Sequence, residues 1–248
     1  MRRNALIALL TMTLAFQVGV ASAGATSLTS PLQNLPIGTL PASCAGAPRG
    51  AACTDAVVSA LDTARASLGL GRYPLPANFD SLSGARQIFI LANLDRIAYG
   101  LTPIEGVAPA LAASAQTGVR TDADPNPTAT LSALPRYAWT SDWAGGWLNA
   151  PYAYYEWMYD DGYAGAATSN VDCTGPAASG CWDHRRNLLA FAQPGTIAMG
   201  VAVGPDAHGA AGYAITLVWT PGQTWSNYSY TWAQANSASA GAPRRPRR

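Results

Sequence analysis

The first 23 residues constrain the fold most, because their pattern is typical of a cleavable export signal. Two arginines follow Met1, residues 5–20 are mostly apolar, and residues 21–23 read Ala-Ser-Ala, which signal peptidases accept. The apolar run of 16 residues is shorter than the roughly 20 that a membrane-spanning helix needs. We therefore expect cleavage after Ala23, a secreted mature chain that begins at Gly24, and no transmembrane segment in the remainder.

Four cysteines form two local pairs along the chain, Cys44 with Cys53 and Cys173 with Cys181. Four cysteines allow three pairings, and proximity favours the two short loops. Because export leads to an oxidising compartment, we expect two disulfides, each restricting the unfolded chain by about 2–3 kcal/mol. A structural zinc site would need thiolates two to four residues apart, which these spacings do not offer. We expect no metal and no other cofactor.

The charge pattern separates an acidic body from a basic end. All 15 basic residues are arginine, and this absence of lysine in a chain rich in alanine and glycine indicates GC-rich codon usage and favours a bacterial source. Residues 24–243 hold nine arginines and 14 acidic residues. Such a body repels phosphate backbones, so we do not expect it to bind nucleic acid.

The chain is long enough for one main domain with a sizeable core. We expect a signal peptide at residues 1–23, an extended lead-in with the first disulfide at 24–53, a single domain at 54–232 and a disordered tail at 233–248. Four of the last five residues are arginine. The tail either contacts anionic envelope polymers or lipids or simply solubilises the terminus.

Apolar spacing and turn residues predict five helices and then a strand-rich end. The helices are expected at about residues 54–68, 81–100, 107–117, 151–159 and 183–191. Branched and small residues alternate over residues 196–203 and 213–220 around a Gly-Pro-Asp turn, which predicts a hairpin. Aromatic and polar residues alternate over 225–232, which predicts a further strand.

Tryptophan and tyrosine are concentrated between residues 137 and 163. Because the chain has only four phenylalanines, a core needs many of these side chains, and core packing is the first interpretation. The alternative is an aromatic wall that binds an apolar or carbohydrate ligand. The candidate ligand-binding residues are Trp143, Trp147, Tyr155, Trp157 and Asp161.

Three segments, in this order, resemble the CAP superfamily of secreted proteins. The first is Asn93-Leu94-Asp95-Arg96 followed by Gly-Leu-Thr-Pro at 100–103, and the second is Trp157-Met158 at the end of a helix. The third is Gly-Cys-Trp-Asp-His-Arg-Arg-Asn-Leu-Leu at 180–189, which is similar to the family's Gly-His-Arg-x-Asn-Ile-Leu segment. The resemblance implies an α+β fold, an α-β-α sandwich with a central antiparallel sheet, and extracellular residence.

Many CAP domains have a cleft with two histidines and two acidic residues, which holds a divalent metal in some members. His184 matches the second histidine, and Asp160 stands where some members carry the second acid. The first histidine falls on Gly118, and the first acid falls near Ser141, with Asp142 as the adjacent substitute. This chain therefore departs from the family at half of the cleft.

The candidate catalytic residues are His184, Asp160 and Ser141, with Asp161 as an alternative acid. A hydrolase would use His184 with one of these carboxylates as acid or base. The structural alternatives are that His184 anchors the disulfide loop and that Asp160 and Asp161 belong to an Asp-Asp-Gly turn after a helix. No Gly-x-Ser-x-Gly elbow presents a serine nucleophile.

Two other titratable residues, Glu156 and His208, are considered for a structural role and for a metal site, respectively. Glu156, on the aromatic helix, is expected to be buried beside Arg96 or Arg185. A two-histidine site would have to recruit His208 from the predicted hairpin turn.

The sequence favours binding over catalysis. The leading hypothesis is a secreted CAP-like domain that acts as a ligand-binding or interaction module outside the cell, with a small molecule or an envelope component as its ligand. The alternatives are a secreted hydrolase that uses His184 with Asp160 or Asp161, and a structural protein of the cell envelope. Because one fold hosts many activities, the site must decide between them.

Overall fold

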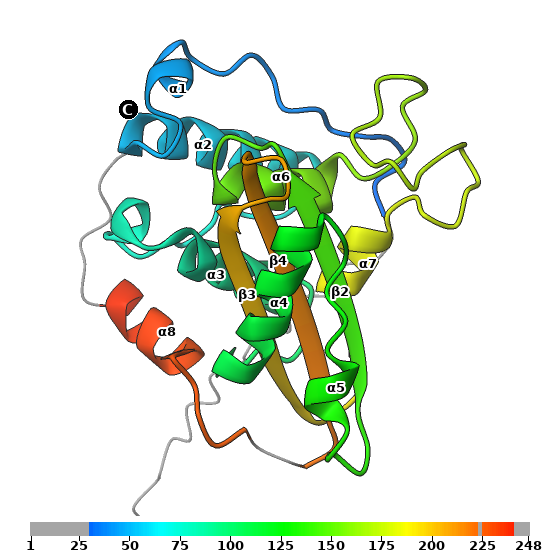
Figure 1. The fold of residues 1–248 in the computed structure, drawn as a ribbon. Helices are drawn as coiled ribbons and strands as arrows, with labels where there is room; N and C mark the ends of the chain where they lie inside the picture. Colours follow the sequence, from blue (N-terminus) through cyan, green and yellow to red (C-terminus); the bar gives the residue numbers. More distant parts are fainter. Residues whose placement is uncertain (1–29, 223–224, 241–248) are drawn as a thin grey trace, which may run out of the picture.

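A computed structural model describes residues 30–222 and 225–240 (Figure 1). The predicted signal peptide, residues 1–23, and the arginines at 244–248 lie outside the described residues. The chain folds into helices and one five-stranded sheet, so the predicted α+β class is confirmed.

The sheet has the strand order β2-β4-β3-β1-β5. The strands β3 and β4 form the predicted hairpin, with Thr196 opposite Thr220 and Pro205 opposite Ala211. The short strand β1 pairs in parallel with β3, whereas the other neighbours are antiparallel, so the sheet is mixed and not purely antiparallel as expected. Two residues are too few for alternation to reveal a strand or its partner. The strands are β1 (Gly106–Val107), β2 (Ala138–Gly145), β3 (Thr196–Pro205), β4 (Ala211–Thr220) and β5 (Tyr230–Thr231).

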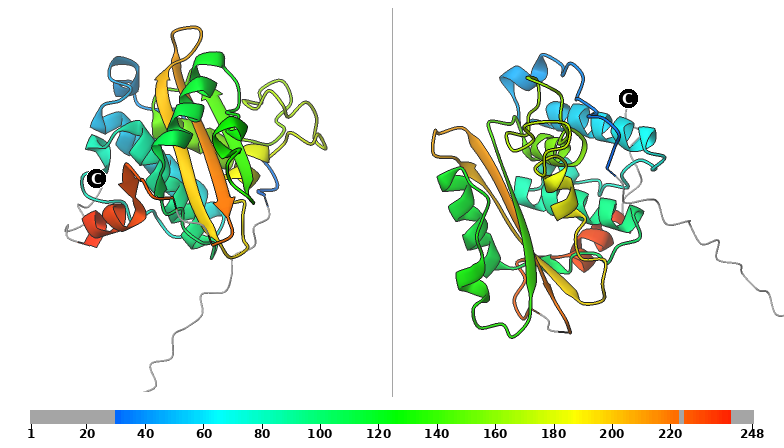
Figure 2. Two further views of the ribbon diagram at one scale, coloured as in Figure 1. Left: turned by 60° about the horizontal axis from the view of Figure 1, so that its bottom comes forward. Right: turned by 90° about the vertical axis from the view of Figure 1, so that its right-hand side faces the viewer.

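Helices cover both faces of the sheet. Figure 2, right, shows α4 (Pro109–Thr121) on one face and α2 (Ala51–Ser67), α3 (Gly84–Ala98) and α6 (Ala150–Tyr159) on the other. The largest cluster of buried side chains fills the space between the sheet and this second group of helices. The shorter helices are α1 (Ser43–Gly46), η1 (Phe79–Ser81), α5 (Thr128–Leu131), α7 (Asp183–Leu188) and α8 (Trp232–Ala240).

Small residues let α4 lie close to the sheet. Ala198, Ala202 and Ala214 are buried in the contact between α4 and the hairpin. A Cβ atom at Gly200 would lie 2.3 Å from the backbone carbonyl of Leu111, a distance that no real side chain tolerates. Glycine is therefore needed at this crossing of α4 and β3.

Asn93 and Arg96, from the first segment that resembles the CAP superfamily, connect α3 to neighbouring segments on its side of the sheet. The Asn93 amide donates to the Ile104 carbonyl (3.1 Å) and accepts from the Ile104 amide (2.6 Å), which joins α3 to the segment before β1. The Arg96 guanidinium donates to the carbonyls of Leu188 (2.9 Å) and Ala190 (2.7 Å) at the end of α7. Both side chains are fully buried, and their role is structural.

Both predicted disulfides are confirmed, and the lead-in is more ordered than expected. Disulfides join Cys44 to Cys53 and Cys173 to Cys181. The lead-in contains α1 and packs against the end of α6, where the Leu35 amide donates to the Tyr159 carbonyl (2.8 Å). The first disulfide is therefore one of several attachments of this segment.

Several predicted element boundaries need correction. The first helix begins at Ala51, and residues 79–81 form a 3-10 turn before α3 begins at Gly84. The strand predicted at 225–232 is reduced to β5, and α8 occupies residues 232–240, where a disordered tail was expected. The Gln234 side chain accepts from the Thr231 amide (2.8 Å), and Ala235 is buried. This local cap and contact form a helix that composition alone did not indicate.

Candidate functional site

A cavity of about 370 Å³ opens beside the edge strand β2. Its lining comes from residues 122–124 after α4, residues 143–145 of β2 with Trp147 in the turn after it, Glu156 and Trp157 of α6 with Asp161 beyond its end, residues 169–172, and His184 of α7. The cavity therefore joins segments that are far apart in the sequence.

Three tryptophans supply the largest apolar side chains of the lining, Trp143, Trp147 and Trp157. The Trp157 indole donates to the Trp143 carbonyl (3.2 Å), which fixes α6 against β2. The rings of Trp147 and Tyr152 have their centroids 5.1 Å apart. The aromatic stretch therefore supplies both core and cavity wall.

The polar part of the lining is dominated by carboxylates. Among the described residues that line the cavity, His184 is the one basic side chain, and no arginine is present. The acidic members are Asp122, Asp124, Glu156, Asp161 and Asp172.

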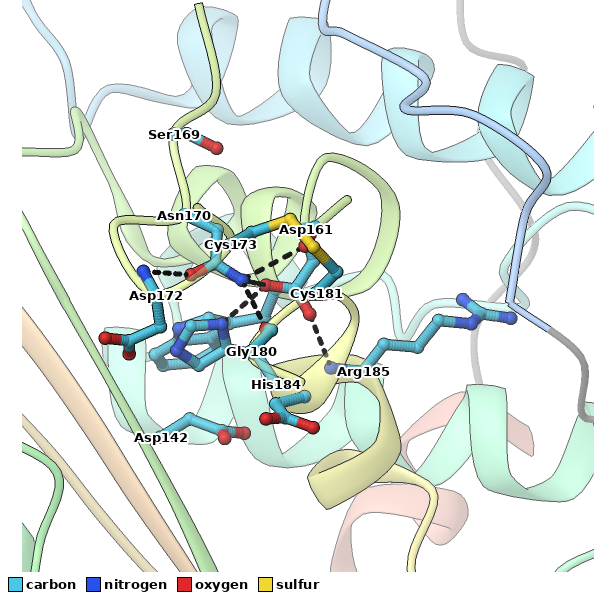
Figure 3. Close-up of polar contacts among 12 residues, drawn as sticks. Asp142, Asp161, Ser169, Asn170, Asp172, Cys173, Gly180, Cys181, His184 and Arg185 are labelled. Atoms are coloured by element: carbon cyan, nitrogen blue, oxygen red, sulfur yellow. Dashed lines mark hydrogen bonds and ion pairs between the residues drawn. A yellow bond between two sulfur atoms is a disulfide. The ribbon is translucent and has the colours of Figure 1, made fainter. Parts of the chain in front are cut away.

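His184 and Asp161 form the centre of this arrangement (Figure 3). His184 Nδ1 lies 2.6 Å from Asp161 Oδ1, which also accepts from the Asn170 amide (2.7 Å), and the Arg185 backbone amide donates to Asp161 Oδ2 (3.3 Å). Burial by itself would lower the pKa of His184, but the hydrogen bond to Asp161 and the charge of Asp142 outweigh it and raise that pKa to about 9. His184 is therefore an imidazolium at neutral pH.

The segment around α7 positions His184 through neighbouring side chains. Arg185 donates to the Met158 carbonyl (2.8 Å) and to the Tyr99 hydroxyl (2.6 Å), which anchors α7 to α6 and α3. Asn187 donates to the Ser141 carbonyl (3.0 Å), which anchors α7 to β2. The residues of the third resemblance segment therefore act as ties between elements.

The disulfide loop supports the same region from the other side. Asn170 donates to the Gly180 carbonyl (2.9 Å) and to the Asp161 carbonyl (3.0 Å). Figure 3 shows the Cys173–Cys181 disulfide beside these contacts. Closing the loop thus holds Asn170 against Asp161.

Glu156 is buried without an arginine partner, which corrects the expectation for this residue. The side chain is 6% exposed, and Oε2 has no hydrogen-bond partner among the described residues. Arg96 and Arg185 donate instead to backbone carbonyls and to a tyrosine hydroxyl. Burial raises the pKa of Glu156 to about 7, against an opposing contribution from the Ser169 hydroxyl.

Asp142 is fully buried and is not among the residues that line the cavity. Its Oδ1 accepts from Asn187 (2.7 Å), and its Oδ2 has no partner among the described residues. Burial raises its pKa well above the usual range, although the charge of His184 opposes the shift. The sequence placed Asp142 only as a substitute near the family's first acid, and the structure places it near His184 (Figure 3).

The structure brings His184 and Asp161 together but not the other catalytic candidates. Successive residues of a strand point to opposite faces, and Trp139 and Trp143 pack on the α4 face, so the Ser141 side chain lies on the face opposite Asp142 and His184. Asp160 ends α6 and does not line the cavity. The Ser-His pairing weighed from the sequence is therefore not formed.

Four of the five predicted ligand-binding residues line the cavity, namely Trp143, Trp147, Trp157 and Asp161. Tyr155 does not, because its hydroxyl donates to the Leu35 carbonyl on the other side of α6. Sequence reasoning missed Asp122, Asp124, Asn170 and Asp172 as lining residues, because an acidic stretch with prolines and a disulfide loop first indicate turns.

The position aligned with the family's first histidine has no space for a side chain. A Cβ atom at Gly118 would lie 2.7 Å from the Ala123 carbonyl oxygen and 2.8 Å from Pro125 Cγ. The other histidine, His208, is exposed, and its Nε2 lies 3.3 Å from Asp122 Oδ2. Among the described residues, no three His, Cys, Asp or Glu side chains are grouped to hold a metal ion. The residues present do not fit the metal site that the resemblance implies for some members.

No helix within residues 30–222 and 225–240 is long and apolar enough to cross a membrane. No family model, no curated protein and no solved structure matches the chain.

Proposed function

We propose that the protein is an exported CAP-like domain that binds a small ligand in the cavity beside His184. The observation that carries this proposal is the cavity itself, which combines three tryptophans with two buried polar atoms that have no hydrogen-bond partner among the described residues. Its volume of about 370 Å³ falls within the range of small-molecule sites, about 300–1,000 Å³.

Two buried atoms without a hydrogen-bond partner among the described residues support ligand binding in this cavity. Glu156 Oε2 is an acceptor and Trp143 Nε1 is a donor, and both are buried without a hydrogen bond among the described residues. Leaving such groups unpaired costs about 1–3 kcal/mol each. A ligand with a donor and an acceptor recovers this energy on binding.

The covered sheet and the structural roles of Asn93, Arg96 and Asn187 support the CAP-like assignment. In the proposed architecture α4 forms one outer layer, and α2, α3 and α6 form the other. The Gly118 packing and the loss of the first histidine make this a divergent member that does not use the metal chemistry of the family.

Export is part of the proposal. Two disulfides are the pattern of a chain that folds in an oxidising compartment. N-terminal sequencing of protein recovered from the medium tests this step, with Gly24 as the expected first residue and Met1 as the result that contradicts it.

The binding proposal is tested by protein-observed NMR with a mixture of small aromatic and carbohydrate ligands. We expect chemical-shift changes confined to the cavity lining and weakened in Trp147→Ala, whose native side chain is half-buried in the wall. Trp225→Ala is the matched control, because Trp225 packs on the α4 face and does not line the cavity. Shifts that are equal in both variants, or located elsewhere, contradict the proposal.

One observation favours hydrolysis as a second candidate function. The contact of 2.6 Å between His184 and Asp161 resembles the orienting pair of an acid–base catalyst. With a pKa of about 9, His184 serves as an acid at neutral pH, and Glu156, with a pKa of about 7, is the available base. A screen with ester, peptide and glycoside substrates separates the candidates, since only the hydrolase predicts turnover that is lost in His184→Gln while the fold is retained.

A further inference from the structure

Among the described residues that line the cavity, carboxyl groups outnumber basic groups. Five carboxylates line it against one imidazolium, and that imidazolium is paired with Asp161. The neighbouring Arg186 is paired with Asp183 outside the cavity, and Arg185 points to the Met158 carbonyl. The cavity therefore favours cations and repels anions.

Glu156 provides an independent observation at the same place. Its carboxyl group is more than nine-tenths buried, lines the cavity, and has one oxygen without a donor. A ligand hydroxyl would donate a hydrogen bond to Glu156 Oε2 but would not neutralise the ionised carboxylate. A ligand ammonium group would do both.

The tryptophans of the wall complete the recognition. An organic cation within about 6 Å of an indole face gains about 0.5–2 kcal/mol. The protein uses such contacts elsewhere, with Arg65 over Tyr73 at 4.2 Å and Arg86 over Tyr230 at 4.5 Å. None of the cation–π contacts within the described residues involves Trp143, Trp147 or Trp157. Trp143 and Trp147 are partly exposed and remain available to a ligand, whereas Trp157 is 2% exposed and forms the buried base of the wall.

We propose that the ligand carries an organic ammonium group on an apolar or aromatic body, with the cation at Glu156 and the body against the tryptophans. This inference rests on the proposed function, because it names the ligand class for the same cavity. An inorganic divalent cation is the weaker occupant, since it takes six or more oxygen ligands and no metal-holding group exists among the described residues.

The test uses four probes of nearly equal shape: benzyltrimethylammonium, benzylamine, benzyl alcohol and benzoate. Calorimetric or NMR titration of the disulfide-bonded protein should show the two cations binding about tenfold more tightly than benzyl alcohol, with benzoate weaker still. Glu156→Gln should weaken benzylamine about fivefold or more and leave benzyl alcohol unchanged. Glu105→Gln, at the only other glutamate, is the matched control and should change neither.

Asp122→Asn is a second variant at a less buried position of the lining, and it should also weaken the cations. If benzyl alcohol binds as tightly as benzylamine, the ammonium inference is wrong and the ligand-binding function stands. If none of the four probes binds, the inference fails, and the ligand mixture with Trp147→Ala decides the function separately. Displacement of benzylamine by equimolar calcium chloride would assign the site to an inorganic cation and overturn the inference.

Discussion

His184 Nδ1 lies 2.6 Å from Asp161 Oδ1, and this contact joins α7 to the segment that follows α6. Asp161 is 1% exposed, so its negative charge is compensated by the imidazolium and by the donors of Asn170 and Arg185. The protonation state of His184 therefore depends on its neighbours rather than on solvent.

Removing the charge of Asp161 should lower the pKa of His184. In Asp161→Asn the desolvation of the imidazole is no longer offset by its closest carboxylate, and we expect the pKa to fall by about two units. NMR titration of the His184 ring protons measures it directly. Asp183→Asn, which removes an exposed carboxylate one residue away, should leave the pKa near 9. An unchanged pKa in Asp161→Asn would contradict the assigned cause.

Replacing Glu156 should stabilise the protein at high pH. The folded pKa of about 7 exceeds the ordinary value of 4.5, so the folded state binds the proton more tightly. The contribution of Glu156 to stability is then full below pH 4.5 and is lost as the pH rises through 7, a change of about 3 kcal/mol.

Urea unfolding at pH 5 and pH 8 measures this effect. Glu156→Gln should raise the free energy of unfolding relative to the native protein at pH 8 and have little effect at pH 5. Glu105→Gln should show no such pH-dependent difference. A pH-independent effect of Glu156→Gln would indicate packing and not ionisation as the cause.

Binding of a permanent cation should strengthen as Glu156 ionises. We expect the affinity for benzyltrimethylammonium to rise between pH 6 and pH 8 and this rise to be absent in Glu156→Gln. The titratable groups that interact with Glu156 are Asp160 and Asp161 at the end of α6, and Tyr152 and Tyr155 on that helix, and the Ser169 hydroxyl also contacts its carboxyl group. The pKa of Asp160 is about 6 and reinforces the rise only at its lower end, while the tyrosines titrate above the interval.

His184 is the one basic group among the described residues that line the cavity, and its pKa of about 9 keeps it charged throughout the same interval. The carboxyl groups of Asp122, Asp124 and Asp172 also line the cavity. An affinity that is flat from pH 6 to pH 8 in the native protein would remove Glu156 from the cation site.

The two disulfides should differ in their effect on the cavity. Each closes a short loop, and replacing either pair with serine should cost about 2–3 kcal/mol of unfolding free energy. Only the Cys173–Cys181 loop holds Asn170 and Asp172 at the cavity, so only its removal should also weaken benzylamine binding. The control is the Cys44–Cys53 pair. Equal loss of binding in the two variants would show a general effect of stability.

The buried pair of Arg65 and Asp95 should be the most sensitive polar contact of the second layer. Asp95 accepts from Arg65 and from the hydroxyls of Tyr73 (2.6 Å) and Tyr154 (2.7 Å), and it is fully buried. Asp95→Ala leaves the guanidinium unpaired, and we expect a loss of about 3–5 kcal/mol in denaturant unfolding.

The exposed pair of Arg186 and Asp183 provides the comparison. Its side chains are about half exposed, and Asp183→Ala should cost less than about 1 kcal/mol. If Asp95→Ala and Asp183→Ala lose similar amounts of unfolding free energy, burial does not determine how much each ion pair contributes to stability.

The sequence predicted those helices and strands whose apolar pattern extends over many residues. The helices at α3, α4 and α6 and the β3–β4 hairpin have apolar patterns that survive in the fold. The strand β2 was not predicted, because its residues Ala138–Gly145 have aromatic side chains on one face and both Asp142 and Ala144 buried on the other. Such a strand lacks the alternation of polar and apolar residues that marks an edge.

The site was recovered only in part, for a different physical reason. His184 and the tryptophans were visible because of their residue types, whereas Asp122, Asp124 and Asp172 are ordinary turn residues in sequence. They face the cavity because a left-handed residue, Asp122, ends α4 and because a disulfide closes the loop after Asp172. Their placement depends on packing between segments that are distant in the sequence. Turn residues show no periodic pattern from which such packing could be predicted.

The outer edge of β2 carries a further consequence for a protein at high concentration. Asn187 binds the Ser141 carbonyl, and the Asp124 carboxylate faces the Trp143 backbone, so side chains occupy polar groups that a strand of a second molecule would otherwise pair with. Asp124 lines the cavity and also covers this edge, so we expect a variant that removes its charge to precipitate more readily.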